Sequence, residues 1–174
     1  MNFNSEKTLI IYLSRTGNTE AFAKLIQREV GGTLEELISD PKYKKNFGDL
    51  LTKIIDENKN NEEHEIKPIK ANLANYDTVF VGAPTWNNEL PPPAKTFLKK
   101  YDLSEKTIIP FNTNAGEGIG TCLKELREIY PKAKILPGYS IEGGIELDGI
   151  KKAIESERKT EIEEAVEEWL ASLK

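Results

Sequence analysis

Short apolar runs alternate with amphipathic helical patterns along the whole of this 174-residue chain. The runs at 9–13, 79–83 and 108–111 are too short for helices and rich in β-branched or aromatic residues, so they predict buried strands. Weaker runs at 33–38 and 133–136 include charged residues, as is typical of sheet edges. Apolar residues at helical spacing occupy the intervals, at 21–26, 47–55, 97–101, 119–129 and 162–173. This alternation predicts an α/β fold, a doubly wound five-stranded parallel sheet in the order 2-1-3-4-5.

The length and composition predict one domain that spans residues 1–174. The chain has no linker, repeat or low-complexity tract, and it is long enough to bury a core without disulfides. The only cysteine, Cys122, falls in a helical apolar pattern, so we expect a buried and unreactive thiol. The only histidine, His64, lies in a polar stretch that predicts a solvated loop. One cysteine and one histidine also make a zinc site implausible, and we expect no metal.

The charge of the chain excludes several classes of function. The net charge is −5 and the sequence has no basic stripe, which argues against a nucleic-acid or membrane-surface partner. The chain has no apolar run of about eighteen residues and no export signal, so we expect a soluble, cytoplasmic protein. An acidic surface instead suits docking on a protein partner with a basic surface.

Hydroxyl, amide and glycine residues make up the segment between the predicted first strand and the predicted first helix. These six residues are Ser14, Arg15, Thr16, Gly17, Asn18 and Thr19. A helix N-terminus offers unpaired N–H groups and the positive end of its dipole, so this loop predicts a phosphate site. The loop lacks the glycines and lysine of a Walker A motif and is not a dinucleotide fingerprint, which favours a single terminal phosphate. The alternative is a plain turn with Ser14 or Thr16 as the helix N-cap.

The loops that follow the third and fourth strands should lie beside the phosphate site, because the sheet order places its switch point there. After the third strand come Pro84, Thr85, Trp86, Asn87 and Asn88. Trp86 is suited to lie flat against a planar ring, although a loop tryptophan can also simply cover the core. Asn87 and Asn88 tolerate left-handed backbone and can simply form a tight turn.

The loop after the fourth strand is rich in glycine and short polar side chains. Its candidate ligand-binding residues are Asn112, Thr113, Asn114, Gly116 and Gly118. Their backbone can approach the polar rim of a ring closely, although the segment can also be a flexible connection. A phosphate loop, an aromatic platform and an amide-lined rim together describe a site for flavin mononucleotide (FMN).

These three motifs, in this order, resemble those of the flavodoxin family. The resemblance extends over about residues 7–172 and rests on residues 13–19, 82–86, 95–98 and 110–120. It implies a short-chain flavodoxin that binds FMN in the three loops and transfers electrons between protein redox partners. The sequence departs from the family pattern at Asn87 and Asn88, where a second aromatic residue and a glycine are usual.

Two other functions compete with that of an electron carrier. An NAD(P)H-dependent FMN or quinone reductase could share the fold, but no dinucleotide fingerprint is present. A phospho-receiver domain could share the strand order, but it needs acidic residues where this chain has 12–14 and 81–83, which are Tyr-Leu-Ser and Val-Gly-Ala. Glu89 and Glu117 flank the proposed flavin, and we expect each to make the second electron harder to add.

Overall fold

A parallel sheet forms the centre of the computed structural model, which describes residues 3–43, 47–144, 154 and 156–173. The strands are β1 (Thr8–Tyr12), β2 (Thr33–Glu36), β3 (Thr78–Pro84), β4 (Thr107–Asn114), β5 (Lys134–Ile135) and β6 (Tyr139–Glu142). Their order is β2-β1-β3-β4-β5, which confirms the predicted topology.

The edge of the sheet beyond β4 is made of two short segments. β5 pairs with the start of β4, at Thr107 and Ile108, and β6 pairs with its end, from Phe111 to Asn114. Pro137 lies between the two segments and has no N–H to donate, so the ladder is interrupted there. The sequence predicts the first segment and misses the second.

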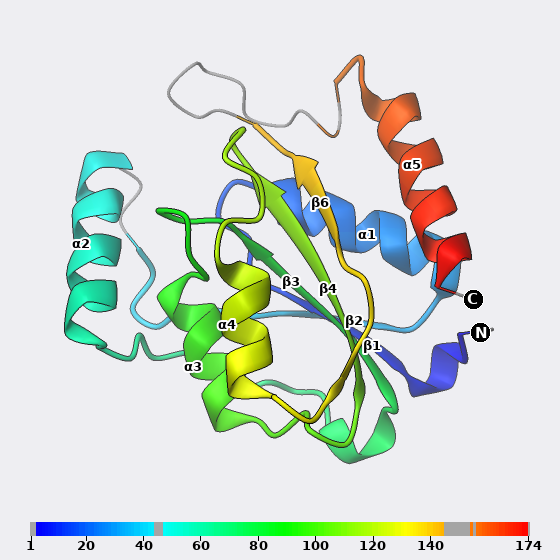
Figure 1. Ribbon diagram of the computed structural model, residues 1–174, viewed down its shortest axis with the longest axis horizontal. Helices are drawn as coiled ribbons and strands as arrows, with labels where there is room; N and C mark the ends of the chain where they lie inside the picture. The colour runs from blue at the N-terminus through cyan, green and yellow to red at the C-terminus, as the bar shows by residue number, and fades with distance from the viewer. Residues whose placement is uncertain (1–2, 44–46, 145–153, 155, 174) are drawn as a thin grey trace.

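Helices cover both faces of the sheet (Figure 1). The helices of the described residues are α1 (Asn18–Val30), α2 (Phe47–Asn60), α3 (Pro92–Lys100), α4 (Cys122–Ile129) and α5 (Lys159–Ser172), with short 3-10 turns at Ser5–Lys7 and Leu73–Asn75. α3 and α4 cover one face, where Leu9 and Val79 are buried. α1 and α5 cover the other face, where Ile10 and Phe80 are buried. No helix within the described ranges is long and apolar enough to cross a membrane.

Gly82 in β3 leaves room for a phenylalanine of the neighbouring strand. A Cβ atom at Gly82 would stand 2.1 Å from Cζ of Phe111, its partner in the β3–β4 register. The Phe111 ring then packs edge-on against Phe22 of α1, with 5.0 Å between ring centroids. A side chain at position 82 would therefore push apart the sheet and α1.

α2 stands away from the sheet, at the same end of the molecule as α3 (Figure 1). Leu50 and Ile54 lie one turn apart on its buried side, while Ile55 is 40% exposed. The apolar side of α2 therefore faces the protein although the helix does not lie on the sheet.

His64 follows α2 and is buried, so the prediction of a solvated loop is wrong. His64 Nδ1 lies 2.8 Å from Glu57 Oε1, and Nε2–H donates to the Pro41 carbonyl at 2.8 Å. The Tyr43 hydroxyl donates to Glu57 Oε2 at 2.6 Å, and the Tyr43 ring stacks on the His64 ring. We call Tyr43, Glu57 and His64 the buried polar cluster. Its members satisfy one another across three segments, which no local sequence pattern shows.

Candidate functional site

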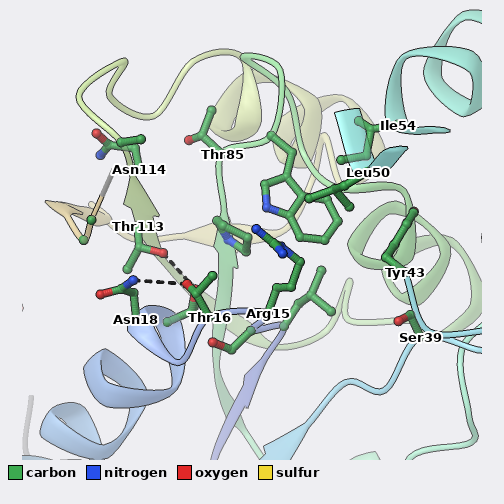
Figure 2. A pocket seen from close by; sticks show the side chains of 18 of the residues that line it. Arg15, Thr16, Asn18, Ser39, Tyr43, Leu50, Ile54, Thr85, Thr113 and Asn114 are labelled. Carbon is green, nitrogen blue, oxygen red and sulfur yellow. Dashed lines mark hydrogen bonds between the residues drawn. The ribbon is translucent and has the colours of Figure 1, made fainter. Parts of the chain in front are cut away.

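A cavity of about 790 Å³ opens at the carboxyl ends of the central strands (Figure 2). All three loops that the sequence singles out contribute to its wall. Eleven of the sixteen candidate residues line it: Ser14, Arg15, Thr16, Asn18, Thr19, Pro84, Thr85, Trp86, Asn87, Thr113 and Asn114. The location agrees with the rule that ligands bind beyond the strand ends at a topological switch point.

The loop at residues 14–19 leads into α1, whose N-terminus is not capped by a side chain. Gly17 is the N-cap of α1 in left-handed backbone (φ 91°), and it has no side chain to bond the first helical N–H groups. The alternative that Ser14 or Thr16 caps the helix is wrong. Ser14 Oγ accepts from the Gly17 N–H at 3.2 Å, and Thr16 Oγ1 accepts from Asn18 Nδ2 at 3.1 Å. The loop is thus tied internally while the helix end faces the cavity.

A hydrogen bond between two buried hydroxyls joins the first and third loops. Thr19 Oγ1 lies 2.8 Å from Thr113 Oγ1, and both residues are at most 3% exposed. Beside them the Gly143 N–H donates to the Asn114 carbonyl at 2.8 Å. The start of α1 and the end of β4 therefore form one closed floor.

The loop after β3 contains a tight turn. The backbones of Trp86 and Glu89 exchange hydrogen bonds of 3.0 and 3.1 Å around Asn87 and Asn88, whose φ angles are 50° and 66°. Left-handed backbone at both central residues is the hairpin geometry that asparagine tolerates. The Asn88 carbonyl accepts from the N–H and hydroxyl of Thr121, at 2.8 and 3.1 Å, so the turn is fixed to the loop before α4.

The position of Trp86 is compatible with both of the roles considered for it in the sequence. It is partly buried against the core, and it also lines the cavity. Its ring meets the Tyr43 ring edge-on, with 5.3 Å between centroids.

Five candidate residues do not line the cavity: Gly17, Asn88, Asn112, Gly116 and Gly118. Asn112 is buried beneath it and donates from Nδ2 to the Ala83 carbonyl at 2.9 Å. The N–H groups of Gly116 and Gly118 donate to Asn114 Oδ1 at 2.9 and 3.1 Å. In the described structure these groups hold the loops in shape.

The cavity extends to a side that the sequence did not single out. This side is lined by residues between β2 and α2 and along α2 itself: Ser39, Lys42, Tyr43, Leu50, Leu51 and Ile54. The opposite end includes Gly143 and Gly144. The glycine pair was a usable signal, because glycine lets the backbone approach a ligand closely, whereas α2 looked like any amphipathic core helix.

The charged groups near the cavity differ in how they are compensated. Burial lowers the pKa of Arg15, because its charged form is partly removed from water. Glu89 pairs with Lys95 at 2.8 Å and does not line the cavity, whereas the exposed Glu117 does. Cys122 is buried, as expected, and burial raises the pKa of its thiol to about 12, which disfavours the reactive thiolate. Among the described residues no three acidic, histidine or cysteine side chains form a metal-binding group.

The parallel sheet in this order and the cavity at its switch point define an α/β protein of flavodoxin-like fold. A family model described as flavodoxin matches residues 7–157, so the chain belongs to the flavodoxin family. The resemblance inferred from the three loop motifs is thereby confirmed. A comparison with curated protein sequences found no match.

Solved structures similar to this chain are flavoproteins. A flavoprotein from Bacteroides uniformis is 28% identical, with a TM-score of 0.75 over 97% of this chain and 99% of that one. A flavoprotein from Bacteroides eggerthii is 30% identical, with a TM-score of 0.69 over 78% and 87% of the two chains. A flavoprotein from Lactobacillus acidophilus, solved in complex with FMN, is 25% identical, with a TM-score of 0.64 over 78% and 92%.

Proposed function

We propose that the cavity binds FMN without a covalent bond and that the protein transfers electrons between protein redox partners. The uncapped N-terminus of α1, which faces a cavity that Trp86 also lines, is the observation on which this proposal rests. The FMN complex of the Lactobacillus acidophilus relative supports it. Bound FMN would supply the redox chemistry, and the protein would supply binding, orientation and electrostatics.

In this proposal different residues of the cavity contact the phosphate and the ring of FMN. The phosphate lies at residues 14–19, where helix N–H groups and the hydroxyls of Thr16 and Thr19 are suited to a dianion. The planar ring lies against Trp86, between the loops that follow β3 and β4.

A comparison of FMN with riboflavin tests the phosphate loop. Because one phosphate would accept several charge-assisted hydrogen bonds, FMN should bind at least about tenfold more tightly, or about 1.4 kcal/mol. Thr16→Ala should reduce FMN affinity and leave riboflavin affinity unchanged, whereas Thr160→Ala on the exposed start of α5 should change neither. Equal affinities for the two flavins in a fluorescence titration would refute the loop.

Substitution of Trp86 tests the ring position. A stacked indole should quench flavin emission, so Trp86→Ala should weaken FMN binding and increase the fluorescence of bound flavin. If both quantities stay at wild-type values, Trp86 serves only to cover the core.

The salt dependence of electron transfer tests whether the redox partner has a basic docking surface. With a net charge of −5, the protein should meet basic redox proteins faster at low salt. Stopped-flow transfer of electrons to a basic acceptor protein should slow steeply with ionic strength. A rate independent of salt would contradict a basic docking partner.

The extent of the cavity favours a second candidate function. The wall on the α2 side lies outside the loops assigned to FMN, and it would leave room for a reactant of an NAD(P)H-dependent FMN or quinone reductase. Rapid bleaching of the bound flavin by NADPH alone would establish the reductase. Slow bleaching together with fast reduction by a protein partner would support the carrier.

A further inference from the structure

The cavity contains a second region whose chemistry differs from that of the phosphate loop. We call it the α2-side compartment and define it by Ser39, Lys42, Tyr43, Leu50, Leu51 and Ile54. Figure 2 shows Arg15 pointing into the cavity between Thr16 and Thr113 on one side and Tyr43, Leu50 and Ile54 on the other. The two regions therefore meet at Arg15.

One wall of the compartment is apolar and another is aromatic. Leu50 and Ile54 lie one turn apart on α2 and, with Leu51, line the cavity from that helix. Tyr43 and Trp86 form the aromatic wall, and their ring planes are perpendicular. Such surfaces suit the faces and edges of a flat unsaturated ring.

The walls are also held in place. The Tyr43 hydroxyl donates a hydrogen bond to Glu57, and the Tyr43 ring stacks on the His64 ring. The buried polar cluster therefore fixes the position of the aromatic wall. Hydrogen bonds from Tyr43, His64 and Lys53 hold the pKa of Glu57 below its usual value against the opposing effect of burial. A wall fixed before binding reduces the entropy lost when a ligand is bound.

The charge around the compartment favours an anion. Lys42 and Arg15 both line the cavity here. The carboxylates that line the cavity, Glu36 at the end of β2 and Glu117 after β4, are not among the six residues that define the compartment. Lys42 has no ion pair with any residue that the structure describes. Lys42 is the only charged residue among the six that define the compartment, so the compartment itself carries a positive charge beside apolar surface.

We propose that the α2-side compartment binds a small planar aromatic acid, with its ring against Leu51 and Tyr43 and its anionic group at Lys42. This proposal rests on the proposed function, because it places the second ligand beside bound FMN.

A matched pair of probes tests the proposal on the FMN-saturated protein. Naphthalene-2-sulfonate and naphthalene-2-sulfonamide have nearly the same shape, but only the first is charged. In calorimetric titrations the sulfonate should bind at least about fivefold more tightly, or about 1 kcal/mol. Lys42→Gln should remove this preference, while Lys134→Gln, at the other end of the sheet, should retain it. Leu51→Gln should weaken both probes to the same degree.

Three results of the probe titrations would overturn the proposal. They are the absence of binding, equal binding of the two probes to the wild type, and an unchanged preference in Lys42→Gln. Displacement of FMN by the sulfonate would also overturn it, because the compartment would then belong to the flavin itself. FMN affinity, measured first without probe, reports separately on the proposed function, and retained FMN binding shows that each variant is folded.

Discussion

The hydrogen bond between the Thr19 and Thr113 hydroxyls should make a measurable contribution to the free energy of unfolding. Thr19→Val preserves the shape but leaves the buried Thr113 hydroxyl without its partner at 2.8 Å. We expect a loss of about 1–3 kcal/mol in the free energy of unfolding, measured by urea denaturation without flavin. The double variant with Thr113→Val should lose less than the sum of the two single variants, because no hydroxyl is left unpaired. An additive double variant would show that the two hydroxyls are not coupled.

Glu117 should influence the reduction potential of bound FMN. It lines the cavity, and its Oε2 accepts from the Ala115 N–H at 2.9 Å, which keeps the carboxylate near the opening. Removal of a negative charge favours addition of an electron, so Glu117→Gln should raise the potential by about a few tens of millivolts at low salt. Spectroelectrochemistry measures this shift.

Glu89 provides the matched comparison for that measurement. Its carboxylate pairs with Lys95, so Glu89→Gln should shift the potential less than Glu117→Gln does. This revises the expectation from the sequence that both glutamates act on the flavin. Equal shifts from the two variants would show that the ion pair does not compensate the charge of Glu89.

At the scale of elements, the ionisation of Glu57 in α2 should make the stability of the fold depend on pH in the acid range. A carboxyl whose pKa is lower in the folded than in the unfolded state stabilises the fold above its unfolded pKa, and this contribution is lost as the pH falls through the folded value. The free energy of unfolding should therefore fall below about pH 4.5, and Glu57→Gln should lack this part of the fall. Urea denaturation across the acid range measures the effect, with the exposed Glu105→Gln as control. Parallel curves for wild type and Glu57→Gln would contradict the assignment.

The elements also show what the sequence could and could not predict. Strands and helices were predictable because their apolar periodicity is local, and the loops at 14–19 and 84–87 because strand order fixes where strand ends meet. The segment β6 was missed because it resumes the edge after Pro137. The burial of His64 and the role of Tyr43 arise from contacts among segments distant along the chain, which leave no periodic signal.

At the scale of the whole molecule, FMN should stabilise the protein as one cooperative unit. A ligand at about 100 times its Kd adds about 2.7 kcal/mol to the stability of the folded state. For a chain of this size that corresponds to a rise in Tm of about 5–10 °C. Scanning calorimetry should show one transition that moves with FMN, in line with our proposal that residues 1–174 form a single domain. Two transitions, of which only one moves, would contradict the single domain.

The close fit of Gly82 and Phe111 has an evolutionary consequence. A Cβ at position 82 would clash with the phenylalanine ring, so a larger residue at position 82 requires a smaller one at position 111. Homologues that carry a larger residue at the first position should carry a smaller one at the second. Ancestral lineages should have exchanged the two volumes almost together, and this pair should emerge as correlated substitutions when many flavodoxin sequences are aligned.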